Sequence, residues 1–426
     1  MPDTFTASGN CAIAMNTYAL IIFLTILASF FLDVSADLLN LRALDPNIPP
    51  EFTGVYDAEK YRASQEYTRV NTQFGFLSAT VSLIVTFAFW LSGGFQWLDG
   101  VARGWGWHPI ATGIAYIGLL VIAKTLLSLP FSIYDTFVIE ARFGFNQTTP
   151  GVFAADLLKS VALSIVIGVP LLAGILAFFQ YAGHWAWLAC WIATTLVMLF
   201  LQFIAPTWIM PLFNTFTPLE DGELRGRILA YARDVDFPLE NVFVMDGSKR
   251  STKSNAFFTG FGKHKRIALF DTLLAKHSTD ELVVILAHEI GHYKKKHVLK
   301  GLLIGIAHTG VMFYLLSIFL HHRGLFEAFY IKQPSIYAGL ILFGMLFSPM
   351  EELLSVGLYK MMRTHEYEAD RFAVETTNMA APFVNALKTL SVHNLSNLTP
   401  HPFYVALNYS HPPVLQRIQA IRAFSQ

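Results

Sequence analysis

Two histidines and a glutamate on one short stretch have the residue types and the spacing of a hydrolytic metal centre. The stretch reads His288-Glu289-Ile290-Gly291-His292, which matches the pattern HExxH. On a helix, positions i and i+4 lie on one face about 5–6 Å apart, so both imidazoles can reach one ion. The glutamate between them lies near the same ion and has the chemistry of a general base. We therefore predict that His288 and His292 bind zinc and that Glu289 is the catalytic base.

A zinc hydrolase also needs a third protein ligand and an open position for water. The stretch 365–370 carries the candidates. Glu366 and Asp370 are i and i+4 on a helix, so Glu366 suits a ligand and Asp370 suits a carboxylate that orients a ligand histidine. His365 and Glu368 are rival third ligands, and their spacing leaves the choice open. A solvated acidic helix face would account for the same residues without a metal.

The composition places this chemistry in a membrane protein. Of the 426 residues, 54% are hydrophobic and 14% are charged, whereas a soluble domain carries roughly 25% charged residues. The 30 basic and 30 acidic residues balance, which disfavours a nucleic-acid partner. The high apolar content makes the lipid bilayer the expected partner. The 2 cysteines are too few for a disulfide framework or a cysteine-rich metal site. Stretches of about 20 apolar residues predict membrane-spanning helices at 11–32, 74–97, 110–129, 157–179, 185–205, 298–320 and 335–354.

The polar stretches between and after these spans should position the chemistry. We predict two strands and two helices in them, at 241–245, 266–270, 280–297 and 363–377. Thr279 or Asp280 is the expected N-cap of the first helix, and the second helix continues the last span. The chain then divides into spans one to five (1–213), a metalloprotease domain (214–297), spans six and seven (298–362) and a part that supplies the third ligand (363–426).

Basic residues predict how the spans are oriented. The loops after the first, third and fifth spans share a side with the C-terminus, and these loops carry most of the lysines and arginines. The opposite loops carry only Arg103, Arg323 and Lys332. Because basic loops stay in the cytosol, we expect a cytosolic site and an N-terminus outside. No lysine or arginine precedes the first span, which favours a retained helix over a signal peptide.

Several motifs together resemble the type I CAAX prenyl proteases, the sterile-24-type membrane zinc metalloproteases, which are distantly related to the HtpX heat-shock proteases. HExxH is followed by two spans and then by an ExxxD helix, as in that family. Further agreement lies in the loop after the third span (134–146), the exit from the fifth span (206–214), the substrate-strand region (246–260) and a C-terminal HPP motif with its arginine (411–417). The chain is identified as a member of this family over most of its length after Arg62.

The resemblance implies an all-α membrane protein with a small α+β metalloprotease part. About seven transmembrane helices would enclose a water-filled chamber, with a gluzincin-like HExxH and ExxxD zinc site at its cytosolic end. Zinc is the implied cofactor, one ion per chain. The roles that the resemblance implies at this site are zinc ligation by His288, His292 and Glu366, base catalysis by Glu289, and support of a ligand by Asp370.

The resemblance also implies substrate contacts. Asn255 falls on the asparagine beside the substrate-binding edge strand of the family, and Ala256 and Phe257 follow it as substrate-binding residues. His411 and Arg417 fall on groups that face the scissile carbonyl, although a histidine before two prolines, taken alone, is more typical of an ordinary loop. The expected partner is a peptide or protein substrate, and in this family it is a prenylated one.

One departure bears on the source and the substrate. Eukaryotic members carry a long insertion between the last two spans, whereas here that loop is only 321–334. This suggests a compact bacterial member in the inner membrane; a eukaryotic member would lie in the endoplasmic reticulum. The expected function is a zinc-dependent endopeptidase that processes CAAX-type C-termini at the cytosolic membrane face.

Three alternatives remain open at this point. The first is an HtpX-like protease that degrades damaged membrane proteins. The second is a site-2-type intramembrane protease, which the position of HExxH before a span disfavours. The third is a transporter or membrane scaffold with an incidental motif, which zinc content would distinguish from an enzyme.

Overall fold

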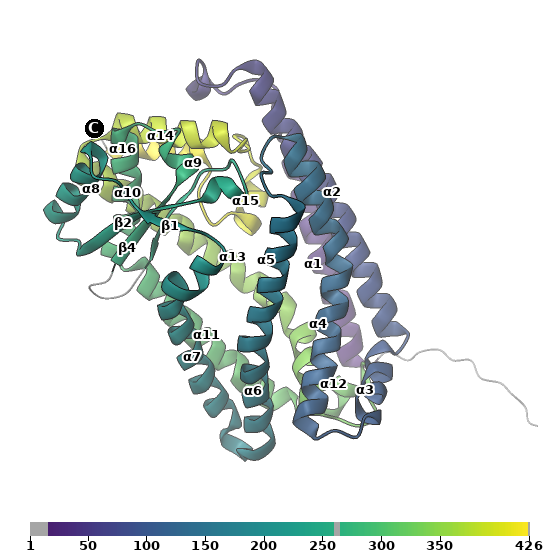
Figure 1. The fold of residues 1–426 in the computed structure, drawn as a ribbon. Helices are drawn as coiled ribbons and strands as arrows, with labels where there is room; N and C mark the ends of the chain where they lie inside the picture. The colour runs from purple at the N-terminus through teal and green to yellow at the C-terminus, as the bar shows by residue number, and fades with distance from the viewer. Residues whose placement is uncertain (1–15, 260–264, 425–426) are drawn as a thin grey trace, which may run out of the picture.

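The structure, a computed structural model, describes residues 16–259 and 265–424. A bundle of long helices carries a small sheet and several shorter helices at one end (Figure 1). This arrangement confirms the predicted fold class. The described residues include 7 helical stretches long and apolar enough to cross a membrane, as the sequence predicts: Thr17–Arg42, Ala58–Leu91, Pro109–Glu140, Pro150–Tyr181, Gly183–Leu212, His297–Phe319 and Ile336–Thr377.

The surface of the bundle is apolar, as contact with lipid requires. Only 6–22% of each apolar window is buried inside the protein. Ile84, Leu158 and Val166 are 61%, 70% and 69% exposed. Such a continuous apolar surface would cause aggregation in water, whereas hydrocarbon solvates it. The helices that carry it are α1 (Thr17–Arg42), α2 (Ala58–Leu91), α4 (Pro109–Tyr134), α5 (Pro150–Leu163), α6 (Val169–Tyr181), α7 (Ala186–Ile204), α11 (His297–Phe319) and α13 (Ile336–Thr377).

Several span boundaries differ from those expected, most clearly in the first two spans. Residues 11–15 of the first predicted span lie outside the described residues, and α1 continues well past residue 32 to Arg42. The second span was expected to reach residue 97, which is wrong, because α2 ends at Leu91. Gly93 has a left-handed φ of 78°, which terminates a helix, and the separate helix α3 (Gly94–Gly104) follows it.

The small sheet has four strands in the order β1-β2-β4-β3. The central pair, β2 (Leu239–Met245) and β4 (Lys265–Phe270), is parallel and confirms both predicted strands. The two edge strands, β1 (Phe216–Pro218) and β3 (Ala256–Thr259), pair antiparallel with them. Runs of 3 and 4 residues are too short to show an alternating pattern, so spacing predicted neither strand. The family resemblance did imply an edge strand beside Asn255, where β3 lies.

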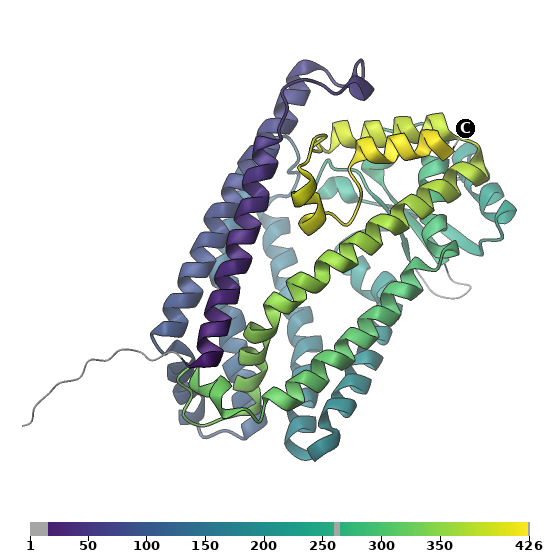
Figure 2. The same cartoon turned by 180° about the vertical axis from the view of Figure 1, so that it is seen from behind.

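Helices cover this sheet and share one apolar core with it. They are α8 (Glu223–Asp234), α9 (Asp271–Leu274), α10 (Thr279–Lys294), α14 (Ala380–His393) and α16 (Val414–Phe424), with α15 (Pro402–Asn408) beside α1 and α13. The helix α13 runs unbroken from the far end of the bundle into this layer (Figure 2). It therefore confirms that the helix predicted at 363–377 continues the seventh span.

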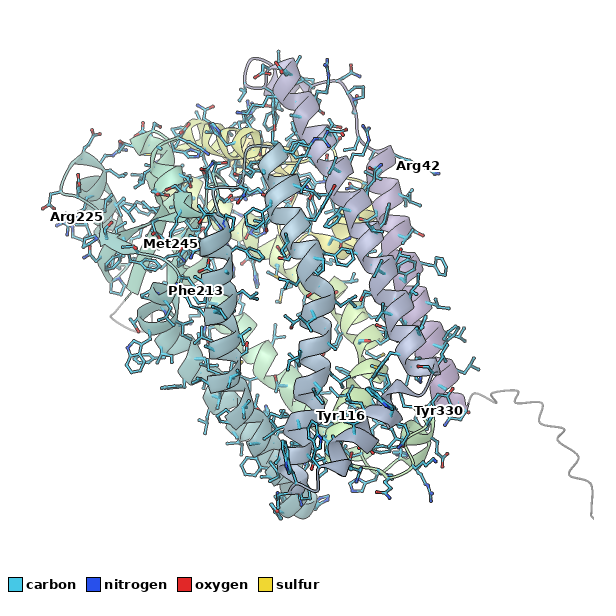
Figure 3. The ribbon with its side chains drawn as sticks, turned by 45° about the vertical axis from the view of Figure 1, so that its right-hand side comes forward. Arg42, Tyr116, Phe213, Arg225, Met245 and Tyr330 are labelled. Atoms are coloured by element: carbon cyan, nitrogen blue, oxygen red, sulfur yellow. The ribbon has the colours of Figure 1, made fainter. Side chains whose placement is uncertain are left out.

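A second core closes the opposite end of the bundle, which we call the distal end. It is built by α3, α12 (Arg323–Glu327) and the beginning of α13. The ring of Trp90 stacks on Phe329 with a centroid separation of 4.6 Å, and its Nε1 donates to the carbonyl of Ala328 at 2.8 Å. Tyr116 and Tyr330 mark this end in Figure 3, whereas Arg225 and Met245 mark the end that carries the sheet.

One buried carboxylate lies within the distal core. Asp99 is 1% exposed, and both of its oxygens accept hydrogen bonds. The hydroxyl of Tyr337 donates to Oδ1 at 2.6 Å, and Nε of Arg103 donates to Oδ2 at 2.8 Å. A second nitrogen of Arg103 donates to the carbonyl of Gln333 at 3.0 Å. This cluster links α3 to the start of α13.

Candidate active site

The helix α10 carries the HExxH motif inside the core of the sheet layer. Its N-terminus is a capping box, in which the Ser278 hydroxyl accepts from the amide of Glu281 and the Glu281 carboxylate accepts from the amide of Ser278. The N-cap is therefore Ser278, and the expectation of Thr279 or Asp280 was wrong. The helix ends at Lys294 rather than at residue 297. The run 282–288 is entirely buried, which fixes the depth of the motif.

The long helix α13 brings the second part of the site to α10. The two helices pack closely, and Gly291 makes this approach feasible. A Cβ at Gly291 would lie 3.1 Å from Cα and 3.2 Å from the carbonyl oxygen of Ala369. That spacing is tighter than ordinary van der Waals contact. The glycine within HExxH thus sets how near Glu366 comes to the two histidines.

His288, His292 and Glu366 converge on one point. A ligand atom from each lies within 4.8 Å of the other two. The Nε2 atoms of the histidines are 3.2 Å apart, and Nε2 of His292 is 3.2 Å from Oε1 of Glu366. Nε2 of His288 is 3.5 Å from Oε2 of the same carboxylate. The structure therefore brings together the three residues that the sequence predicts as ligands.

The chemistry of these three groups fits a cation. Two imidazole nitrogens that face each other at 3.2 Å and a carboxylate beside them all present lone pairs to the same space. Oε2 of Glu366 is buried, and no described residue donates a hydrogen bond to it. Two histidines with one glutamate are a ligand set that zinc hydrolases use, with the fourth position left to water. A divalent ion would satisfy all of these groups.

Asp370, itself held by Arg417, contacts His288 at its Nδ1 atom. Nδ1 of His288 lies 2.9 Å from Oδ1 of Asp370, a carboxylate that is completely buried. Arg417 from α16 donates to both oxygens of this carboxylate, at 2.9 and 2.6 Å. Since Nδ1 of His288 donates to Asp370, its Nε2 keeps the lone pair that faces Glu366. The bidentate contact raises the pKa of Arg417 even though burial opposes its charge, so the ion pair stays ionised.

Glu289 lies on α10 between the two histidines. Burial raises the pKa of its carboxyl above the ordinary value, and the neighbouring Glu366 adds to this rise. A carboxylate with a raised pKa is a better proton acceptor near neutral pH than an exposed glutamate. Its position and its electrostatics therefore suit proton transfer.

His411, in the loop before α16, approaches the carboxylate of Glu366. Its Nε2 lies 3.3 Å from Oε1 of Glu366, yet 62% of its side chain is exposed. Arg417 differs, because its side chain is only 12% exposed and its nitrogens point at Asp370 and Glu366. The structure thus places both residues at the cluster, with His411 open to an incoming group and Arg417 engaged by the protein.

The predicted substrate-binding residues lie at the free edge of the sheet. Asn255 precedes β3, and its side chain accepts a hydrogen bond from the amide of Ala256 at 2.8 Å. The ring of Phe257 packs edge-on against Phe270, with centroids 6.3 Å apart. The strand β3 contacts α10 and pairs with β4 on only one side within the described sheet. Its other edge offers backbone groups to an extended peptide.

The two rival ligands occupy a different place. His365 and Glu368 are absent from the cluster of convergent ligand atoms found among the described residues. Both contact His297 instead. The His365 ring stacks on it with centroids 3.9 Å apart, and Oε2 of Glu368 lies 2.8 Å from its Nε2. His297 was not predicted as a site residue, although its position directly after three lysines and five residues after His292 was visible in the sequence.

Seven membrane-spanning helices among the described residues, with an HExxH helix and a carboxylate from the last span beside its two histidines, define a multi-pass membrane metallopeptidase. Comparisons with known proteins agree. Residues 37–215 match the family described as "CAAX prenyl protease N-terminal, five membrane helices". Residues 218–425 match "Peptidase family M48". The chain belongs to peptidase family M48, and it is a membrane endopeptidase of that family.

Relatives of known description support this membership over nearly the whole chain. The chain is 35% identical to the CAAX prenyl protease 1 homolog of Arabidopsis thaliana, covering 92% of this chain and 94% of the relative. It is 33% identical to the Homo sapiens homolog, with 89% and 90% covered. The crystal structure of S. mikatae Ste24p superposes with a TM-score of 0.90 at 33% identity, covering 95% of this chain and 99% of that one.

Proposed function

We propose that His288, His292 and Glu366 bind one zinc ion and that Glu289 is the general base of peptide hydrolysis. The convergence of the three ligand atoms within 4.8 Å is the observation that carries this proposal. When bound, zinc lowers the pKa of a coordinated water to about 7 and polarises the carbonyl of the scissile bond. The carboxylate of Glu289 takes a proton from the attacking water and passes it to the leaving amine nitrogen.

The remaining residues have positioning and electrostatic tasks in this proposal. Nε2 of His411, which is exposed beside Glu366, donates to the oxygen that becomes negative as the carbonyl is attacked. Arg417 acts through Asp370, because its hydrogen bonds to that carboxylate hold His288 in place. Asn255, Ala256 and Phe257 align the substrate as an added strand along β3.

We further propose that the substrate is a protein or peptide with a prenylated CAAX C-terminus. The names of the relatives, CAAX prenyl protease 1 and its homologs, support this substrate class. The site lies where two of the spans, α11 and α13, adjoin the sheet layer, so a lipidated chain end can reach it from the membrane. Unprenylated peptides would then be cleaved more slowly.

We place the site on the cytosolic side of the membrane. The end of the bundle with the sheet carries most of the basic loops, whereas the distal end carries Arg103, Arg323 and Lys332. A bacterial inner membrane is the location that the short loop 321–334 supports. A reporter fused to the C-terminus, active only in the cytosol, tests this orientation; activity of a periplasmic or lumenal reporter there would contradict it.

The catalytic proposal is tested with purified protein in detergent. Glu289→Gln should retain one zinc per chain but lose about 10²–10⁴-fold in kcat on a farnesylated CAAX peptide, because the proton acceptor is gone. His288→Ala should lose the zinc itself, and a chelator should inactivate the wild type. The exposed Glu375→Gln on α13 is the matched control and should match the wild type. Wild-type turnover by zinc-loaded Glu289→Gln would overturn the assignment of the base.

The substrate class needs a separate comparison. The farnesylated peptide and its unprenylated counterpart are cleaved side by side, and kcat/KM is measured for each. We expect a higher value for the farnesylated peptide. Equal values would contradict recognition of the prenyl group and would leave peptide hydrolysis itself intact.

A further inference from the structure

The two ligand histidines are supported in different ways. His288 contacts a buried carboxylate directly, through Nδ1 to Asp370 at 2.9 Å. The Nδ1 atom of His292 has no carboxylate partner within the described contacts. This atom lies 3.0 Å from Nδ1 of His297, and Nε2 of His297 lies 2.8 Å from Oε2 of Glu368. Through this chain of contacts, His292 therefore reaches a carboxylate on this side only by way of an intermediate residue, His297.

The hydrogen-bond pattern assigns one arrangement of protons along this chain. Nε2 of His292 faces Nε2 of His288 and Oε1 of Glu366, so it must keep its lone pair for a metal. Nδ1 of His292 then carries the proton and donates it to Nδ1 of His297. His297 in turn carries its proton on Nε2 and donates to Glu368. Both contacts of the chain then join one donor to one acceptor.

The backbone places His297 for this role. The helix α10 ends at Lys294, and α11 begins at His297 after only two residues. Lys296 between them has a left-handed φ of 59°, an unfavourable conformation for a residue with a side chain. This turn returns the chain so that the His297 side chain, only 4% exposed, contacts His292. The His365 ring, parallel to within 9°, fixes its remaining face.

The positions on α13 explain why Glu366 and Glu368 have different partners. Residues two apart on an α-helix point about 200° apart around the axis. Glu366 faces the pair of histidines on α10, whereas Glu368 reaches the first residue of α11. One helix thus supplies a ligand and, through His297, a support for another ligand.

We propose that His297, held by Glu368, is a positioning residue that fixes the orientation and tautomer of His292 toward the metal. The proposal rests on the proposed function, because it needs His292 to bind zinc. Partners of this kind, outside the ligands themselves, typically change metal affinity by 10–100-fold when they are removed. In this proposal His297 acts only through His292, so its removal should change zinc affinity rather than the turnover of the zinc-loaded enzyme.

The test compares two substitutions at one position. His297→Phe keeps a ring against His365 but removes both nitrogens, so zinc should bind about 10–100-fold more weakly. His297→Gln keeps one acceptor and one donor, so its zinc affinity should lie closer to that of the wild type. Zinc Kd is measured by chelator competition on full-length protein in detergent. At saturating zinc, kcat of His297→Phe should recover most of the wild-type value.

A second substitution tests the far end of the chain of contacts. Glu368→Ala removes the acceptor for His297 and should weaken zinc binding less than His297→Phe does. Glu375→Gln is again the control on the same helix. The visible absorption of the cobalt-substituted protein gives an independent readout, because it should shift in His297→Phe and stay unchanged in the control.

The outcomes separate the two proposals. A wild type without stoichiometric zinc would overturn the proposed function itself. A wild type that binds zinc, with His297→Phe binding it equally tightly, would overturn only the role of His297. A lower melting temperature with unchanged zinc Kd would assign His297 a purely structural role and would also overturn the proposal. If His297→Phe does not fold, Glu368→Ala decides, and wild-type zinc affinity there would overturn it.

Discussion

The two ends of the helix bundle both bury a carboxylate beside an arginine, yet they do so with opposite results. At the distal end, both oxygens of Asp99 accept hydrogen bonds, from Tyr337 and Arg103. At the end with the sheet, Oε2 of Glu366 has no hydrogen bond from any described residue, and its two oxygens face the Nε2 atoms of two different histidines. A buried polar cluster whose members satisfy one another stabilises the fold. A cluster that leaves lone pairs convergent is prepared for a ligand.

The largest expected contrast comes from His411. His411→Ala should lower kcat by about 10²–10³-fold, or about 3–4 kcal/mol, because a donor to the developing oxyanion is lost. Zinc content and melting temperature should stay at wild-type values, since the side chain is mostly exposed. Peptide cleavage at saturating substrate and zinc analysis on the same sample measure this. Loss of zinc along with activity would show that His411 belongs to the metal site instead.

The reverse pattern is expected at the distal end. Arg103→Leu leaves Asp99 without its cationic partner and should lower the free energy of unfolding by about 3 kcal/mol. The kcat of the folded fraction should not change, because Asp99, on α3, contacts the start of α13, far from Glu366 on the same helix. Thermal unfolding in detergent and activity below the transition measure the two quantities.

A double substitution controls this experiment. Arg103→Met combined with Asp99→Asn removes both charges and should recover much of the lost stability. A double variant no more stable than Arg103→Leu would mean that the charge pair itself is not the source of the effect.

A smaller effect on stability and zinc binding is expected at the contact between α10 and α13. Gly291→Ala places a Cβ 3.1 Å from Cα of Ala369, so α13 must shift by a few tenths of an ångström. Such overpacking costs about 1–3 kcal/mol, and we expect weaker zinc binding as well because Glu366 moves with α13. Gly301→Ala is the control, since no atom lies within 4 Å of its Cβ position. Equal zinc affinity in Gly291→Ala and wild type would contradict this account of the close approach.

The smallest expected effect is a pH dependence of stability near the sheet layer. Burial, with Lys276 and Lys60 nearby, lowers the pKa of His393 to about 4. An unfolded histidine titrates near pH 6.5, so between about pH 6.5 and 4 the unfolded chain binds more protons at this site than the folded chain does. Stability from this group is therefore complete above pH 6.5 and is lost as the pH falls toward 4, by about 1 kcal/mol after solvent screening.

His393→Gln removes this titration. The difference in melting temperature between His393→Gln and the wild type should vary with pH over that window, whereas acid effects on the metal ligands cancel in the difference. A difference that is constant from pH 7 to 4.5 would contradict the lowered pKa of His393.

The sequence predicted the parts of this molecule that have a strong local signal. Apolar length predicts the seven spans, and the short apolar runs at 241–245 and 266–270 predict β2 and β4. The capping box of Ser278 and Glu281 was also readable as the pattern S-x-x-E, and it was overlooked. Gly93 could have indicated the end of α2 in the same way.

The remaining features depend on contacts between distant segments, which spacing does not reveal. The choice between Glu366 and Glu368 follows from how α13 is rotated against α10 and α11. The partnership of Arg417 with Asp370 depends on α16 folding back onto α13. The short edge strand β3 exists only because β4 lies beside it. Each of these features depends on tertiary packing and not on the local sequence.

The unbroken course of α13 has a consequence for when the protein becomes a protease. Its 42 residues extend for about 63 Å, and the same helix begins in the distal core and carries Glu366 and Asp370 in its last three to four turns. The two histidines are synthesised earlier, on α10, but they lack their carboxylate partners until this last span has been inserted. With the proposed ligands, the nascent chain therefore cannot complete its ligand set while its membrane part is unfinished. On that proposal, the order of synthesis delays hydrolytic activity until the protein is anchored in its bilayer.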